Sequence, residues 1–597
     1  MRQQIVRHGA AAVVALHALL APAAGAQTGA PATDPQVVAG ETGRRMDEFL
    51  SRQAAFGFSG QVLVARGRDV LLHRAYGWAD RERRRPLTTG TRVGIASASK
   101  QFTAAAILRL EQEGRLSLRD SLGQHLPGVP ADKRGITLRM LLTHTSGIRG
   151  GFTEDFDVAS ADSSIARLLG APLTGQPGSA WRYSSDAYNL LAAVAERVSG
   201  APFERYVETA LFRPAGMRSS GFWWQLRGDT GAVAHAYRGW RDRGSPALWP
   251  RNWRVTGSGD VVTTAADLYA WHRALTAGRV LGRRTLARYL APQVPIPESG
   301  GLSYGYGLFF GTSERGGAFY EHGGDTELGF NAAFYRYPST DGVVIVVSNA
   351  RDHGGTSARQ FVQAQLEAML FGADSLPLPP AARPFTAGEL AALAGSYALA
   401  GGGTLHLVSD GALLWAAGEG QAGLDLFNPR EGGEGARRAG ERTRALLEGL
   451  LARDLAAFDL ALTDSGAVHR AGYVAEWREL LAKEGPLHRF EVVGSARSGS
   501  ALVTFARLHF LQGSRTMSFR WPNEALGRLS GTSVPAPSFP WAYPAARGAG
   551  DELIVHDPFR GRTIARLRGR PDGSLLVERD GMRLETGPVR RTGWVPR

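Results

Sequence analysis

The chain of 597 residues contains no cysteine. This absence excludes disulfide bonds, a cysteine nucleophile, thiolate metal sites and a lipid anchor on cysteine. Lysine is nearly absent too, since only Lys100, Lys133 and Lys483 occur. The net charge of +14 therefore comes from arginines, which are spread along the chain and mixed with acidic residues. We interpret this charge as a solvated basic surface and expect no nucleic-acid partner.

Long apolar runs are also lacking. Gly9–Ala21 is a short apolar stretch that follows the basic residues Arg2 and Arg7, and Ala24-Gly25-Ala26 has the pattern of an export cleavage site. These features predict a signal peptide over residues 1–26 and a periplasmic or secreted protein after cleavage near Ala26. No later run reaches about 20 apolar residues, so we expect no membrane span.

The rest of the composition, with 43% apolar and 21% charged residues, is typical of a folded chain of several domains. Changes in pattern along the chain predict five segments after the signal peptide. These are a flexible leader (27–44), a main domain (45–372), a linker rich in proline and alanine (373–385), a small β-domain (386–430) and an α+β accessory domain (441–597).

Within the main domain, strand patterns lie near both ends and helix patterns lie between them. This order predicts an α+β fold, with an antiparallel sheet flanked by helices, followed by a C-terminal β-rich and α+β accessory region. The expected hairpins cover 59–76 and 332–348, and the expected helices cover 43–56, 97–114, 137–143, 186–198, 356–371 and 442–459. Residues 430–440 are expected to be a charged spacer, and 492–521 and 552–588 to be strand-rich.

Ser97-Ala98-Ser99-Lys100 opens a helix pattern and carries the clearest chemical signal. Residues three apart share one face of a helix, so Ser97 and Lys100 lie one above the other. A serine hydroxyl needs a nearby base to become a nucleophile, and a desolvated lysine can supply one. The motif alone also fits a serine helix cap followed by an exposed lysine.

The surrounding motifs resemble the serine β-lactamase and penicillin-binding-protein-like superfamily, in its class C β-lactamase and esterase branch. The similar segments follow the order found in that superfamily and extend over residues 45–372. They are the hairpin Val62–Tyr76, the nucleophile segment Gly94–Ala104, the loop Leu141–Ile148, Tyr183-Ser184-Ser185, Gly257–Leu268, Tyr304–Gly307 and His322-Gly323-Gly324.

This resemblance implies roles for individual residues. Tyr183 and Lys100 activate Ser97, with a phenolate of Tyr183 favoured by the lysine charge, and Tyr183 later protonates the leaving group. Ser185 contacts the substrate. The backbone N–H groups of Ser97 and Asp325 form an oxyanion hole.

His322, Gly323 and Gly324 are implied to bind substrate on an edge strand of the cleft. The glycines allow the substrate backbone to approach, and His322 lines the pocket or holds a substrate carboxylate when charged. An ordinary strand-end histidine is the alternative.

Two positions depart from the superfamily pattern and direct the choice of activity. Ser185 replaces an asparagine, and His322 replaces the lysine of true β-lactamases. A fixed positive charge for the drug carboxylate is then missing at neutral pH, so we expect an esterase first. A peptidase acting on D-amino-acid peptides, including cell-wall fragments, is the second alternative, and weak β-lactamase activity is the third. An alternative of another class is a catalytically weak module that binds cell-wall peptides.

No cofactor and no metal are expected, because the predicted acyl transfer requires neither and His144, His235 and His353 lack ligand spacing. We interpret His144 as a structural residue. Phe222-Trp223-Trp224 fits either a pocket mouth or core packing. The oligomeric state and the natural substrate stay open.

Overall fold

The computed structural model describes twelve stretches of the chain, and the structural statements below concern these residues. They are 35–150, 160–226, 231–352, 356–373, 376–400, 402–427, 433–452, 477–498, 501–521, 531–533, 542–579 and 582–588. The expected signal peptide (1–26), the first part of the expected leader (27–34) and His353 lie outside the described residues.

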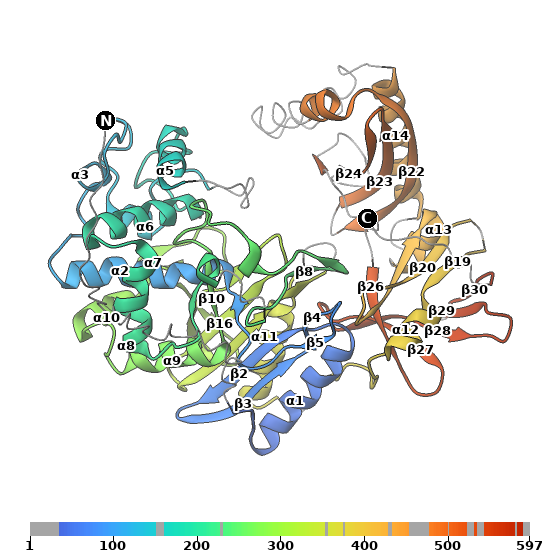
Figure 1. The fold of residues 1–597 in the computed structure, drawn as a ribbon, viewed down its shortest axis with the longest axis horizontal. Coiled ribbons are helices and arrows are strands. Elements are labelled where there is room, and N and C mark those ends of the chain that lie inside the picture. Colours follow the sequence, from blue (N-terminus) through green and yellow to red (C-terminus); the bar gives the residue numbers. More distant parts are fainter. Residues whose placement is uncertain are drawn as a thin grey trace, which may run out of the picture.

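A ten-stranded antiparallel sheet forms the centre of the main domain and confirms the α+β expectation (Figure 1). Its two halves come from opposite ends of the domain, because β2 pairs with β17 along seven residues. The strand order is β1 (Val37–Val38), β3 (Asp69–Tyr76), β2 (Gly60–Arg66), β17 (Gly342–Ser348), β16 (Asn331–Tyr337), β14 (Gly317–Glu321), β13 (Phe309–Ser313), β12 (Ser303–Tyr304) and β11 (Val294–Pro295), with β15 (Gly324–Asp325) paired to β16.

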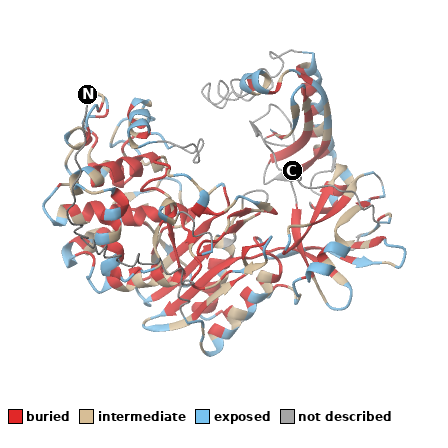
Figure 2. Ribbon diagram, in the orientation of Figure 1, coloured by how far each residue is buried: buried red, intermediate tan, exposed pale blue. Residues whose placement is uncertain are grey.

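The central strands are buried on both faces (Figure 2). Val62 and Val64 pack with α1 (Gly40–Ala55) and α11 (Ala358–Leu370), whereas Leu63 and Ala65 pack into the helical half. This alternation explains why both strands are almost continuously apolar, as period-two side chains must be apolar on both sides when helices cover both faces.

The helical half surrounds two strongly buried helices, α2 (Lys100–Gln112) and α6 (Ser185–Ser199), which pack on each other. The other elements of this half are α3 (Leu122–His125), α4 (Leu138–Leu142), α5 (Ala161–Gly170), α7 (Phe203–Val207), η2 (Glu208–Phe212), α8 (Arg213–Ala215), α9 (Ala265–Thr276) and α10 (Arg283–Tyr289).

Short strands and turns connect the two halves. A three-stranded sheet joins β6 (Val93–Gly94), β10 (Val261–Thr263) and β7 (Gly221–Phe222) in that order. The remaining elements are β4 (Trp78–Asp80), β5 (Arg85–Pro86), η1 (Ala96–Ser99), η3 (Trp223–Leu226), β8 (Tyr237–Arg238), β9 (Arg241–Asp242), η4 (Pro246–Leu248) and β18 (Ala350–Arg351).

The C-terminal region forms an eight-stranded sheet that follows α12 (Ala387–Leu393). Its strand order is β19 (Gly395–Ala398), β20 (Thr404–Ser409), β21 (Leu414–Glu419), β26 (Ala542–Arg547), β27 (Glu552–Asp557), β28 (Arg562–Gly569), β29 (Leu575–Arg579) and β30 (Met582–Glu585). A separate four-stranded sheet lies in sequence between β21 and β26. Its strands are β22 (Leu487–Ser498), β23 (Ala501–Phe510), β24 (Gly513–Trp521) and β25 (Gly531–Ser533). Helices α13 (Gly420–Phe427) and α14 (Gly433–Leu451) precede it.

This topology differs from the expected division of the C-terminal region into 386–430 and 441–597. Strands β21 and β26 pair directly, so residues 542–585 complete the sheet that begins at residue 395. The unit with α14 and the four-stranded sheet is therefore an insertion. Pairing between strands more than 120 residues apart leaves no local pattern in the sequence.

Two further expectations differ from the structure at the ends of elements. Val37–Val38 pairs with β3 and α1 begins at Gly40, so the end of the expected leader is ordered structure. Helix α14 begins at Gly433, where a spacer was expected, because its arginines and acids are exposed while Ala436 and Ala439 are buried. Among the described residues, no helix combines the length and hydropathy that crossing a bilayer requires.

Candidate active site

Ser97 lies at the junction of the small three-stranded sheet and the buried helix α2. The chain runs from β6 through the short helix η1 directly into α2. Ala96, immediately before Ser97, has a φ of 47°, a left-handed conformation that costs an alanine free energy. The strained turn holds Ser97 half-exposed on an otherwise buried segment, where a substrate can reach its hydroxyl.

Lys100 is fully buried, and its three hydrogen bonds fix its ammonium group. Nζ lies 3.1 Å from Ser97 Oγ, 3.2 Å from Ser185 Oγ and 3.0 Å from the carbonyl oxygen of Ser258. A lysine ammonium has three N–H donors, and the geometry supplies one acceptor for each. The structure thus brings Ser97, Lys100 and Ser185 together, with Ser185 contacting the lysine.

Tyr183 completes this group on the exposed side. Lys100 Nζ lies 4.9 Å from the centre of the Tyr183 ring, and the phenol forms a hydrogen bond with Ser97. Burial of the hydroxyl raises the pKa of Tyr183 well above its ordinary value, and the hydrogen bond with Ser97 opposes this shift only in part. The phenol therefore carries its proton at neutral pH, which differs from the expected phenolate.

The start of α6 explains the position of Tyr183 and Ser185. Ser184 is the N-cap of this helix, and its Oγ accepts a hydrogen bond from the N–H of Ala187 at 3.1 Å. Its own hydroxyl donates to the carbonyl of Arg149, and its N–H donates to His144 Nδ1. These bonds fix the backbone on both sides of Ser184, so its two neighbours point toward Lys100.

The backbone of β15 lies directly against the nucleophile segment. A Cβ atom on Gly324 would collide with the carbonyl oxygen of Ile95 and lie 2.7 Å from the nitrogen of Ser97. A Cβ on Gly323 would collide with the guanidinium of Arg359 and lie 3.0 Å from the carbonyl oxygen of Ala332. The close packing of β15 therefore requires a glycine at position 324, next to the N–H group expected to bind an oxyanion, whereas at position 323 the arginine side chain could move aside.

His322 lies between β14 and β15. Among the described strands, β15 pairs with β16 alone and so forms a local edge of the sheet. The Nδ1 of His322 lies 2.6 Å from the carbonyl oxygen of Gly323 and its Nε2 lies 3.2 Å from the hydroxyl of Tyr304.

The partners of His322 determine its tautomer. A carbonyl only accepts, so Nδ1 carries the proton and Nε2 accepts from Tyr304. Burial, with Lys100 as the next cause, lowers the pKa of His322 to about 3. The imidazole is therefore neutral at physiological pH and is not placed to hold a substrate carboxylate.

His144 lies behind the site in a layer of aromatic rings. Its ring centre lies 4.4 Å from that of Tyr183, 5.1 Å from that of Tyr188 and 4.6 Å from that of Tyr304. Burial lowers the pKa of His144 well below its ordinary value, and Lys100 and His322 add to the effect. A neutral, fully buried ring that accepts from Ser184 N–H is consistent with a structural role.

Arg359 is a residue that the sequence analysis did not single out. It lies at the start of α11, where its Nε donates to Asp325 Oδ2 at 2.8 Å and its guanidinium covers Gly323. This bond fixes the side chain of Asp325, the second residue expected to supply an oxyanion donor. No local motif reveals the pair, because the two residues belong to different elements.

No group of three or more histidine, aspartate or glutamate side chains within the described ranges is placed to hold a metal ion. His235 instead pairs with Asp242, with Nδ1 2.7 Å from Oδ2. In the aromatic stretch Phe222-Trp223-Trp224, Phe222 belongs to the main core. Trp223 is buried in a smaller core cluster with Val255 and Val262 and also lines a pocket.

Known proteins resemble this chain over most of its length. A family model described as Beta-lactamase matches residues 43–367, more than half of the chain. Penicillin-binding protein 4* of Bacillus subtilis (strain 168) is 30% identical over 397 residues, which cover 63% of this chain and 87% of that protein. Esterase EstB of Burkholderia gladioli is 36% identical over 181 residues, which cover 27% of this chain and 46% of that protein.

The octameric penicillin-binding protein homologue from Pyrococcus abyssi is similar in structure, with a TM-score of 0.52 at 18% identity. The match covers 92% of this chain and 100% of that chain. At this identity the likeness concerns the fold.

Proposed function

Since the chain belongs to the beta-lactamase family, we propose that it is an exported serine hydrolase that cleaves an ester or amide through an acyl-enzyme on Ser97. The observation that carries this proposal is the contact between Ser97 Oγ and the buried Nζ of Lys100 at 3.1 Å. The half-exposed hydroxyl is open to a substrate, while the amine beside it is shielded from water.

In the proposed first step, the neutral amine form of Lys100 takes the proton of Ser97 as Oγ attacks the carbonyl carbon. The carbonyl oxygen becomes an oxyanion, which the N–H groups of Ser97 and Asp325 stabilise. The bond to the leaving group then breaks. Tyr183, which burial keeps protonated, donates its proton to the leaving group and recovers one from Lys100.

In the second step, water attacks the acyl-enzyme and gives up its proton to the Lys100–Tyr183 pair. The tetrahedral intermediate collapses, the carboxylic acid leaves and Ser97 recovers its proton. Because all of these groups belong to the chain itself, the proposed cycle uses no cofactor. Ser185 accepts a hydrogen bond from Lys100 and thus holds the amine in place between the two steps.

An ester is the substrate class that the site favours. His322 is neutral and bonded at both ring nitrogens, so it offers no fixed charge for the carboxylate of a β-lactam or a peptide. Similarity to the esterase EstB supports this choice. Similarity to a penicillin-binding protein over 87% of its length supports a second candidate, acylation by penicillin or by a D-amino-acid peptide.

A substrate panel tests the proposal. Purified protein is incubated with p-nitrophenyl acetate, a D-alanyl-D-alanine peptide and a chromogenic cephalosporin, each beside the Ser97→Ala variant. We expect hydrolysis of the ester that requires Ser97, with slower or no turnover of the other two. Faster turnover of the peptide would move the assignment to a peptidase. No Ser97-dependent turnover of any substrate would favour a module that binds cell-wall peptides.

A further inference from the structure

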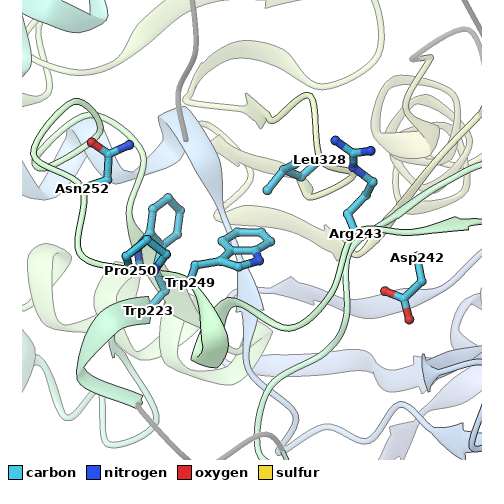
Figure 3. A pocket seen from close by; sticks show the side chains of 7 residues that line it. All are labelled: Trp223, Asp242, Arg243, Trp249, Pro250, Asn252 and Leu328. Carbon is cyan, nitrogen blue, oxygen red and sulfur yellow. The ribbon is translucent and has the colours of Figure 1, made fainter. Parts of the chain in front are cut away.

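A pocket of about 320 Å³ is formed between the segment 223–252 and Leu328, which follows β15. Figure 3 shows two indole rings and Pro250 together, with Leu328 and Arg243 across from them. We call it the tryptophan pocket, and its lining residues are Trp223, Asp242, Arg243, Trp249, Pro250, Asn252 and Leu328.

Hydrogen bonds join the first wall of this pocket to the nucleophile. The N–H of Trp223 donates to the carbonyl oxygen of Asp260 at 3.2 Å, and the N–H of Ile95 donates to the next carbonyl, that of Val261, at 3.1 Å. Ile95 precedes Ser97 by two residues. One strand therefore carries both the tryptophan wall and the turn that presents the serine.

The second wall of the pocket, formed by Leu328, follows β15, whose Asp325 N–H is expected to bind the oxyanion. Leu328 follows Asp325 by three residues, and the nearby Phe330 ring lies so close to Gly94 that a Cβ there would come within 2.9 Å of it. The Phe330 ring centre lies 6.0 Å from that of Trp249. Both walls thus border the segment that carries Ser97.

The two indoles form a corner that suits a flat aromatic group. Their ring centres lie 5.4 Å apart with the planes at 84°, so a third ring that stacks on the partly exposed Trp249 meets Trp223 as the second side of the corner. Trp223 is 3% exposed, and its Nε1 has no hydrogen-bond partner among the described residues. A buried N–H without a partner is costly, so a ligand that brings an acceptor gains the missing bond.

The rim of the pocket carries charges of both signs, from Asp242 and Arg243. Arg243 is exposed, while the nearby Arg238 pairs with Glu327 at 2.8 Å. Asp242 is already engaged, with one carboxylate oxygen 2.7 Å from His235 Nδ1 and the other 2.7 Å from the N–H of Gly244. Arg243 is therefore the cation of the lining that can meet a negatively charged acceptor.

The side on which the pocket lies indicates which part of the substrate it binds. Tyr183, the proposed donor to the leaving group, has Trp181, Phe309 and His322 as ring neighbours, and none of these lines the tryptophan pocket. The leaving group points toward Tyr183, so the acyl group points the other way.

We propose that the tryptophan pocket binds the acyl portion of the substrate and selects an aromatic acyl group that carries a carboxylate or another hydrogen-bond acceptor. This proposal rests on the proposed function of Ser97 and names its substrate class. Stacking on Trp249 selects the ring, and Trp223 Nε1 and Arg243 select the acceptor.

The kinetic test uses three p-nitrophenyl esters, those of acetate, phenylacetate and (4-carboxyphenyl)acetate. We expect Trp249→Ala to lower kcat/KM for both aromatic esters by roughly tenfold or more and to change the acetate ester less than threefold, because only the ring loses its contact. Trp223→Phe keeps a ring without the N–H donor, so it lowers the preference for the carboxylated ester. Leu248→Ala, a neighbour with 69% exposure that does not line the pocket, is the control.

A binding test is independent of catalysis. The inactive Ser97→Ala protein is titrated with phenylacetate and with cyclohexylacetate, and binding is followed by indole fluorescence. We expect the aromatic acid to bind more tightly and its advantage to disappear in Ser97→Ala/Trp249→Ala. Equal losses for all three esters, or equal binding of the two acids, would overturn the subsite. Tight, Trp249-dependent binding by a protein without any esterase activity would instead contradict the proposed function. The pocket would then be a binding site for aromatic acids only.

Discussion

At the scale of single residues, the proton positions decide what Tyr183 does. Its neutral phenol hydrogen-bonds Ser97, and its raised pKa makes it a donor rather than a base in the resting protein. In the proposed mechanism, the neutral amine form of Lys100, 3.1 Å from Ser97 Oγ, is then the group that takes the serine proton. In this proposal, burial keeps the Tyr183 phenol protonated and thereby favours it as the acid.

The variant Tyr183→Phe tests whether Tyr183 is the acid, by comparing leaving groups that do and do not need a proton. An alkoxide needs a proton to depart, and loss of a general acid costs roughly 10²- to 10⁴-fold. A p-nitrophenolate needs none. We therefore expect kcat/KM to fall far more for an alkyl ester than for the p-nitrophenyl ester of the same acid, measured side by side. Equal losses on the two esters would contradict the acid role and favour Tyr183 as the base.

Asp260 gives a pH dependence of stability. Its side chain is 1% exposed, and burial raises its pKa from 3.8 to about 7. The unfolded chain loses this proton near pH 4, whereas the folded protein keeps it to about pH 7. The stabilisation is thus complete below pH 4 and is lost as pH rises from 4 to 7.

We expect Asp260→Asn to flatten part of this decline in melting temperature between pH 5 and pH 7, because its amide does not ionise. The rest of the decline remains in the variant because burial also raises the pKa of Glu321 to about 7. The exposed Asp551→Asn is the control, since its side chain is 99% exposed. An unchanged slope in Asp260→Asn would show that this carboxyl is ionised in the folded protein at pH 5.

At the scale of elements, the contact between β15 and η1 sets the geometry of the site. Gly324→Ala would push the β15 backbone away from Ile95 and Ser97. Displacing an oxyanion donor costs roughly 10²- to 10³-fold in kcat, so we expect a loss of that size in ester hydrolysis with the circular dichroism spectrum retained. Gly388→Ala, in α12 with open space around it among the described residues, is the matched control.

The elements also show how far the sequence predicts this structure. The hairpins, α2, α4 and α6 were predicted within a few residues, because alternation and helix-cap signals are local. The hydrogen bond between His322 and Tyr304, the Arg359–Asp325 pair and the tryptophan pocket were not, since each arises from segments that meet only after folding. The same reason explains the sheet shared by residues 395–419 and 542–585.

At the scale of the whole molecule, the C-terminal sheet is fixed to the main domain by a buried ion pair. Arg81 Nη1 lies 2.9 Å from Asp410 Oδ2, and the two side chains are 1% and 4% exposed. The guanidinium also covers Tyr237 at 4.1 Å, and Trp240 packs against Trp415. Since Tyr237 begins the turn that leads to Arg243, the C-terminal sheet supports one rim of the tryptophan pocket.

Asp410→Ala leaves the buried Arg81 without its carboxylate. Removing one partner of a buried pair costs about 3–5 kcal/mol, so we expect a clear fall in the free energy of unfolding, measured by urea denaturation. Glu441→Ala is the control, because its pair with Arg437 is exposed on both sides and is worth less than about 1 kcal/mol. Equal, small losses in both variants would contradict the role of the pair at the junction.

The presence of an activated serine at position 97 is tested most directly by intact mass spectrometry after treatment with a fluorophosphonate. The purified protein, Ser97→Ala and Lys100→Arg are compared, since an arginine does not deprotonate. We predict one adduct on the unchanged protein, none on Ser97→Ala and a strongly slowed reaction on Lys100→Arg. An adduct that persists in Ser97→Ala, or no adduct on the folded protein, would contradict Ser97 as the nucleophile.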